Sequence, residues 1–216
     1  MRLTADLILR AYARGIFPMA EGAESASLFW FEPARRGILP LERFHTSRSL
    51  VRSFRRGGWR FSCDRDFAGV LAGCADRTET WINAPIARVF TDLHARGHAH
   101  SIEIRDDDGR LVGGVYGLAL GAAFFAESMF SRRTDASKLA LAELVARLRR
   151  GGFRLLDTQY LTEHLARLGG IEVPRATYRQ LLAAALAAPA DHARAFESEN
   201  PGSPVGAYWQ PITQTS

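Results

Sequence analysis

The sequence predicts an α+β protein in which helices flank one mixed sheet. Three strand-like runs between residues 101 and 130 are separated by short turns, which is typical of a β-meander. A segment of helical periodicity, residues 135–150, and a further strand-like run, residues 153–160, follow directly. At 216 residues, 47% of them hydrophobic, the chain is long enough to bury the core of one large domain.

Capping residues and periodicity predict the remaining elements in order. Thr4 is a candidate N-cap for a short helix that Gly15 closes, and Gly151 and Gly152 end the helix at residues 135–150. Two short strands are predicted at 28–31 and 37–40, with a Pro-containing turn between them. The other expected elements are helices at 47–56, 66–74, 85–96, 162–168 and 175–188 and a strand at 59–63.

The order of helix, three-stranded meander, helix and strand is typical of an acetyltransferase-like (GNAT-type) fold, in which two central strands splay apart to form a cleft. We therefore expect a catalytic domain of this type at residues 62–188. A small N-terminal subdomain is expected at 1–61 and a C-terminal tail at 189–216. Fold alone does not license a function.

Charge and apolar patterning limit the location and the ligands. The net charge is +5, and of the 28 basic residues only Lys138 is not arginine, which is compatible with phosphate-bearing ligands. No apolar run is long enough to span a membrane, and Asp6 interrupts the apolar N-terminal stretch, so a cytoplasmic protein is predicted. Cys63 and Cys74 are expected to be buried, reduced thiols.

Two carboxylates, Glu127 and Asp157, fall inside otherwise apolar strand-like runs. Strict alternation puts Phe125, Glu127 and Met129 on one face of a strand, and Asp157 and Gln159 share a face of another. Burying a carboxylate costs several kcal/mol unless a partner meets it. Two interpretations stay open: an acyl-transfer site that holds an amine beside an apolar pocket, or structural carboxylates paired to arginines.

The loop between these strands distinguishes among acyl donors. Residues 131–138, SRRTDASK, contain no glycine, whereas CoA-dependent acetyltransferases use a Gly-rich loop to cradle a pyrophosphate. Side chains of Arg132, Arg133 and Lys138 are better suited to a polynucleotide backbone. A basic helix upstream supplies further candidates for nucleic-acid binding, namely Arg48, Arg52, Arg55 and Arg56.

Five segments in order resemble the leucyl/phenylalanyl-tRNA–protein transferase family. They are AYARGIFPM (11–19), GHAHSIE (97–103), LVGGVYG (111–117), ESMFSRRTDASK (127–138) and LDTQ (156–159). The resemblance implies a bacterial cytosolic enzyme that moves Leu or Phe, and in some cases Met, from aminoacyl-tRNA to the N-terminal Arg or Lys of a protein. It also implies that this transfer marks the acceptor for degradation that depends on its N-terminal residue.

The resemblance also implies roles for individual residues. Asp157 and Gln159 would orient the acceptor amine and manage its proton, and Glu127 would hold the basic N-terminal residue. Trp30 and Phe31 would lie near the terminal adenosine of the tRNA, and Thr162 would help to bind the acceptor. The apolar pocket for the amino acid and its surroundings would comprise Trp81, Val115, Phe124, Met129, Ser131, Leu148 and Leu156.

Other functions stay open at this point. A CoA-dependent N-acyltransferase and a non-enzymatic tRNA-binding module are the two alternatives. His94, His98 and His100 invite comparison with metal ligands, but Gly97 interrupts the segment and an HExxH motif is missing. The sequence therefore predicts neither a metal site nor a cofactor.

Overall fold

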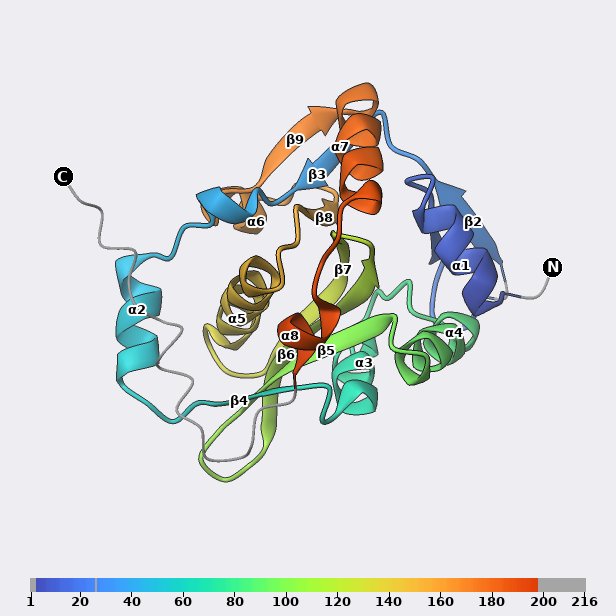
Figure 1. Cartoon of the computed structure of the whole chain (residues 1–216). Coiled ribbons are helices and arrows are strands. Elements are labelled where there is room, and N and C mark those ends of the chain that lie inside the picture. The colour runs from blue at the N-terminus through green and yellow to red at the C-terminus, as the bar shows by residue number, and fades with distance from the viewer. Residues whose placement is uncertain (1–2, 26, 198–216) are drawn as a thin grey trace.

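A seven-stranded mixed sheet forms the centre of the protein (Figure 1). The computed structural model describes residues 3–25 and 27–197. The strand order is β4-β5-β6-β7-β8-β3-β9, in which β7 and β8 are parallel and the other neighbours are antiparallel. The strands are β1 (Phe17–Ala20), β2 (Leu28–Phe31), β3 (Arg35–Ile38), β4 (Arg60–Cys63), β5 (Ala99–Arg105), β6 (Leu111–Leu120), β7 (Ala123–Ser131), β8 (Leu155–Gln159) and β9 (Ile171–Pro174). The predicted α+β class and the meander β5-β6-β7 are confirmed.

Helices cover both faces of the sheet. They are α1 (Ala5–Tyr12), the 3-10 helix η1 (Leu41–Arg43), α2 (Arg48–Arg55), α3 (Phe67–Ala75), α4 (Ala84–Ala95), α5 (Ala136–Arg150), α6 (Glu163–Arg167), α7 (Arg175–Ala187) and α8 (His192–Phe196). Side chains of α1, α3, α4 and α7 pack into one apolar cluster, the first core, which includes Phe125. Those of α2, α5, α6 and α8 pack into the second core, which includes Phe124.

The predicted helix starts are confirmed by their caps. Thr4 accepts a hydrogen bond from the Leu7 N–H, Ser47 from that of Leu50 and Asp66 from that of Gly69. These bonds satisfy N–H groups that the first turn of a helix leaves unpaired. The sequence did not predict β1, β9 or α8.

Of the expected C-terminal tail, residues 189–197 lie in the described part of the chain. They include α8, whose Phe196 is buried and stacks on His100 with ring centroids 3.7 Å apart.

The N-terminal segment contributes to two sheets. β1 and β2 form a separate antiparallel pair, whereas β3 lies between β8 and β9 in the main sheet. A boundary of the N-terminal subdomain at residue 61 stays a prediction, and β3 from within that segment is part of the seven-stranded sheet. No helix within residues 3–25 and 27–197 has the length and apolar character needed to cross a membrane.

β7 and β8 diverge after a short parallel pairing. Their register joins Ala123–Phe125 to Leu155–Asp157, and beyond Phe125 β7 continues to Ser131 against β6 alone. The expected splay of two central strands is therefore present. It opens space between the second half of β7 and the end of β8.

A β-bulge at Glu127 interrupts the alternation of β7. Tyr116 of β6 lies opposite Ser128 and Gly117 lies opposite Ala126, which leaves Glu127 as the extra residue. The predicted common face of Phe125, Glu127 and Met129 is therefore wrong for Met129. Phe125 packs in the first core and Met129 against the second, because the extra residue inverts the alternation beyond it.

Gly117 makes this bulge possible. A Cβ built on Gly117 would lie 2.2 Å from the Phe125 carbonyl oxygen and 2.5 Å from Cε1 of Phe124. We expect Gly117→Ala to lower the free energy of unfolding in urea by about 1–3 kcal/mol, the usual cost of overpacking. Gly22→Ala is the control, since a Cβ there would meet nothing within 4 Å. Equal unfolding midpoints for the two variants would contradict the prediction.

Candidate active site

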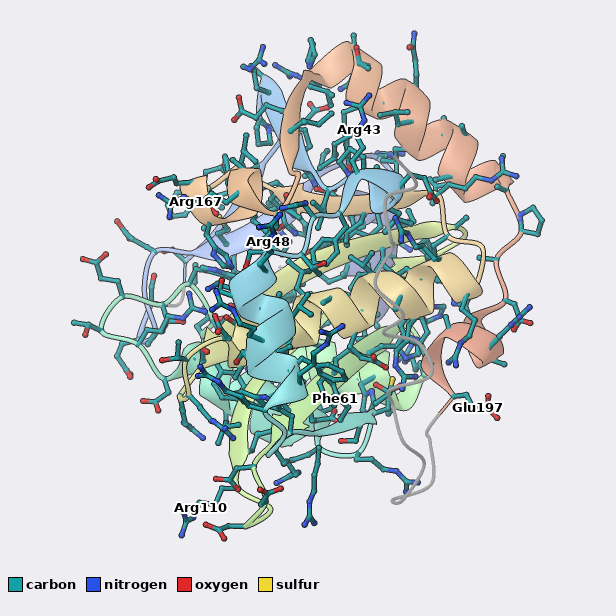
Figure 2. All side chains as sticks on the ribbon, turned by 90° about the vertical axis from the view of Figure 1, so that its left-hand side faces the viewer. Arg43, Arg48, Phe61, Arg110, Arg167 and Glu197 are labelled. Atoms are coloured by element: carbon teal, nitrogen blue, oxygen red, sulfur yellow. The ribbon has the colours of Figure 1, made fainter. Side chains whose placement is uncertain are left out.

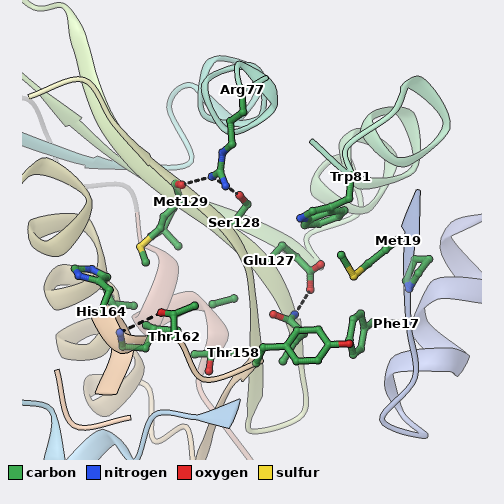
Figure 3. Close-up of a pocket in the computed structure, with 17 residues that line it drawn as sticks. Phe17, Met19, Arg77, Trp81, Glu127, Ser128, Met129, Thr158, Thr162 and His164 are labelled. Atoms are coloured by element: carbon green, nitrogen blue, oxygen red, sulfur yellow. Dashed lines mark hydrogen bonds between the residues drawn. The ribbon is translucent and has the colours of Figure 1, made fainter. Parts of the chain in front are cut away.

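A cavity of about 480 Å³ opens where β7 and β8 diverge (Figure 3). It is lined by residues from β1, β6 and β7, from the loop between α3 and α4, from α5 and from the segment 158–165. Its volume falls within the range of small-molecule sites, about 300–1,000 Å³. Glu127 and Gln159 line it, as do the apolar residues Val115, Met129, Leu141 and Leu165.

Asp157 lies behind this cavity and is fully buried. Both of its oxygens accept from Arg36, with Nε at 2.9 and 3.1 Å and Nη2 at 2.7 Å. The Tyr178 hydroxyl donates to Oδ2 at 2.5 Å, and the Gln159 N–H donates to Oδ1 at 2.8 Å. Arg36 is only 1% exposed and also donates to the Gly15 carbonyl. This network occupies the Asp157 carboxylate with three partners: Arg36 of β3, Tyr178 of α7 and the N–H of the neighbouring Gln159.

Gln159 connects Asp157 to the cavity through hydrogen bonds. Its φ is +57°, a left-handed conformation that is uncommon for a residue other than glycine. The bond from its N–H to Asp157 holds this conformation, and the Tyr160 N–H bonds the Thr158 carbonyl beside it. The Gln159 side chain then donates from Nε2 to Glu127 Oε1 at 3.0 Å.

Gly37 of β3 supports the same turn from behind. A Cβ on Gly37 would lie 2.5 Å from the Tyr160 carbonyl carbon, so the close approach of the two backbones requires glycine.

Glu127 differs from Asp157 in lacking a cationic partner among the described residues. Burial raises its pKa from 4.5 to about 8, and the neighbouring Asp157 adds to the rise. The raised pKa favours the protonated form of the Glu127 carboxyl. Asp157 is paired to an arginine, whereas Glu127 faces the cavity, and its role in acyl transfer stays a prediction.

The residues expected to bind substrate divide into three groups. Trp81, Val115, Met129 and Thr162 line the cavity. Phe124, Leu148 and Leu156 are buried in the second core and do not line it.

The third group lies elsewhere. Trp30 packs against the first core, and Phe31 is 37% exposed and stacks on Phe17. The Ser131 hydroxyl donates a hydrogen bond to the Arg133 carbonyl in the loop before α5. Roles in substrate binding stay predictions for all of these residues.

Several lining residues were not predicted as site residues. Phe17 lies inside one of the matched segments, but its role could not be inferred from spacing. Arg77 of the loop after α3 donates to the Ser128 hydroxyl and the Met129 carbonyl. Tyr160 directly follows β8, and His164, whose pKa is lowered by burial, lies beside Met129 in Figure 3. Their convergence depends on the splay of β7 and β8.

The basic residues expected to bind nucleic acid also differ in their surroundings. Arg48, Arg52, Arg55 and Arg56 are exposed on or just after α2, on the face shown in Figure 2. The three basic residues of segment 131–138 have partners. Arg132 pairs with Asp76 and Lys138 with Asp135, and the Arg133 guanidinium lies over the Trp59 ring, 3.7 Å from its centroid. The exposed arginines on and just after α2 are therefore more available to bind a nucleic acid than the basic residues of segment 131–138.

The remaining candidates are accounted for structurally. His94 bonds the Ala99 carbonyl, and His100 bonds Asp64. Across residues 3–25 and 27–197, no three His, Cys, Asp or Glu side chains are grouped to hold a metal ion. Cys63 and Cys74 are buried and free, as predicted.

The splayed mixed sheet with its cavity defines an acetyltransferase-like fold. The solved structure described as the crystal structure of FemX is similar in fold, with a TM-score of 0.53 at 12% identity, over 78% of this chain and 66% of that one. The family model for leucyl/phenylalanyl-tRNA protein transferase matches residues 38–183, and the model for the N-terminal domain of that family matches residues 1–34. The chain belongs to the leucyl/phenylalanyl-tRNA–protein transferase family.

Relatives named leucyl/phenylalanyl-tRNA–protein transferase match over the whole chain. The protein from Ruegeria pomeroyi is 58% identical over 216 residues, covering 100% of both chains. That from Paracoccus denitrificans is 57% identical over 215 residues, covering 99% of this chain and 98% of its own.

Proposed function

We propose that this protein transfers leucine or phenylalanine, with methionine as a third donor, from aminoacyl-tRNA to the N-terminal Arg or Lys of acceptor proteins. The product would be marked for degradation that depends on its N-terminal residue, and the reaction would take place in the cytosol, where charged tRNA is found. One observation carries the proposal: a single cavity joins an apolar end, with Val115, Met129 and Leu141, to the Glu127–Gln159 pair. Family membership supports it.

The reaction requires orientation more than activation, because an aminoacyl ester is already reactive. The neutral α-amine of the acceptor attacks the ester carbonyl carbon, a C–N bond forms, and the C–O bond to the terminal ribose breaks. The proton lost by the amine ends on the ribose oxygen. Holding the two substrates in one cavity supplies much of the acceleration through effective molarity.

The geometry favours different roles for the three polar residues. Gln159 lines the cavity and would orient the attacking amine, while Glu127 would bind the acceptor's basic side chain. Asp157 acts as a positioning residue in this proposal, because its oxygens are engaged by Arg36, Tyr178 and the Gln159 N–H. It would act on the amine through Gln159.

A transfer assay tests the proposal directly. Purified protein is incubated with radiolabelled Leu-tRNA and a peptide that begins with Arg, and we expect label in the peptide. The same peptide acetylated at its N-terminus is the control, since it lacks the attacking amine. No transfer to the free peptide at any tRNA concentration would refute the proposed function.

The exposed arginines of α2 would contact the tRNA backbone. We expect Arg52→Ala combined with Arg55→Ala to raise the Kd for tRNA about 10-fold at low salt and to reduce the salt slope by about 1–2, as lost phosphate contacts do. A matched control removes two exposed arginines, Arg10 of α1 and Arg88 of α4, because these two helices lie on the other side of the molecule from α2 (Figure 1). Equal losses in both double variants would indicate only a net-charge effect.

A further inference from the structure

Aromatic side chains surround the Glu127 end of the cavity. Trp81 from the α3–α4 loop and Tyr160 after β8 both line it, together with Met19 of β1. Figure 3 shows the Glu127 carboxyl between Trp81 and Phe17, with Met19 beside it. Tyr160 meets Phe17 edge to face, with ring centroids 5.9 Å apart, and 43% of Tyr160 stays exposed. The carboxyl therefore lies among π-faces and a thioether.

The charges around the Glu127 end of the cavity favour a cationic ligand. Gln159 donates a side-chain hydrogen bond to Glu127, and the hydroxyl of the buried Tyr12 also lies close to this carboxyl. The nearby arginines are engaged elsewhere: Arg36 with Asp157, and Arg77 with the Ser128 hydroxyl and the Met129 carbonyl. An incoming cation would favour the ionised carboxylate and gain from the faces of Trp81 and Tyr160.

We propose that Trp81, Tyr160 and Met19 form, with Glu127, an aromatic cage that recognises the acceptor's side-chain cation by charge and alkyl surface. The proposal rests on the proposed function and deepens it. Such a cage does not require N–H donors on the ligand, because ring quadrupoles attract any cation and a single carboxylate supplies the counter-charge. N-terminal lysine that carries three methyl groups on Nζ is therefore an acceptor of this protein.

Four peptides that differ only in the N-terminal residue test the cage: Arg, Lys, Nζ-trimethyllysine and norleucine, each with Leu-tRNA as donor. We expect kcat/KM for trimethyllysine within about 3-fold of that for lysine, and norleucine at least about 10-fold lower, in line with cation–π energies. If kcat/KM for the trimethyllysine peptide is as low as that for the norleucine peptide, the aromatic cage is refuted, because recognition would then require N–H donors on the ligand. Absence of transfer to the Arg peptide would instead refute the proposed function itself.

Substitutions of Tyr160 test whether its aromatic ring contributes to recognition of the acceptor cation. Tyr160→Leu is expected to raise KM for the trimethyllysine peptide about 3- to 10-fold, with little change for norleucine, and Tyr160→Phe to recover most of the loss. Phe29→Leu is the control, because Phe29 is an exposed aromatic outside the cavity. If Tyr160→Leu raises KM for Leu-tRNA and not for the peptide, the ring serves the donor's terminal base and the cage is refuted.

Discussion

Replacing Asp157 with alanine is expected to lower the free energy of unfolding by about 3–5 kcal/mol, the usual cost of leaving one partner of a buried ion pair alone. Arg36 would keep its charge at a site with 1% exposure, and Tyr178 and Gln159 would each lose an acceptor. Urea unfolding followed by fluorescence measures the loss. A variant as stable as the wild type would contradict the network described for Asp157.

A double variant separates stability from function at the same site. Arg36→Met with Asp157→Leu removes both charges, and exchange of a buried pair for apolar residues is often neutral or stabilising. We expect it to recover much of the stability lost in Asp157→Ala. Transfer should stay impaired, because the N–H that holds Gln159 in its left-handed conformation would lack its acceptor. Transfer at the wild-type rate would show that Asp157 does not position Gln159.

Glu127→Gln is expected to change how the stability of the protein depends on pH. Burial raises the pKa of Glu127 from 4.5 to about 8, so the folded protein keeps a proton that the unfolded chain loses as the pH rises. The stability from this group is fully present below about pH 4.5, falls as the pH rises, and is lost above about pH 8. The total change is on the order of 3–5 kcal/mol at 1.36 kcal/mol per unit.

Glutamine keeps the hydrogen bond from Gln159 but cannot titrate. The thermal midpoint of Glu127→Gln should therefore rise relative to that of the wild type between pH 5 and pH 8.5. Glu24→Gln, at an exposed position, is the control and should follow the wild-type curve. A constant difference between Glu127→Gln and the wild type across this range would contradict the raised pKa.

The same substitution is expected to weaken acceptor recognition. A basic side chain that enters the cavity would ionise Glu127 and release a proton, which calorimetry in two buffers of different ionisation enthalpy detects. We expect Glu127→Gln to abolish this release and to lower kcat/KM for the Arg peptide about 30- to 100-fold, as loss of a buried charge partner does. An unchanged preference for Arg over norleucine would exclude Glu127 from acceptor binding.

Local signals in the chain were sufficient for most elements. Caps such as Thr4 and Asp66, and stops such as Gly151, set helix ends that depend on neighbours only a few residues away. β1 and β9 are four-residue strands in which tertiary pairing outweighs a weak local pattern. α8 lies in an Ala- and Pro-rich stretch, and burial of Phe196 against His100 helps to hold it in place.

The sequence by itself determined the α+β class and the family, and it marked Glu127 and Asp157 as candidate site residues, because periodicity and ordered motifs are properties of the linear chain. Only the tertiary structure decided how the two carboxylates differ. Arg36 reaches Asp157 across 121 residues of sequence, and the bulge at Glu127 arises from the register between β6 and β7. A carboxylate's partners, and hence its protonation, are set by segments that meet only when the sheet is assembled.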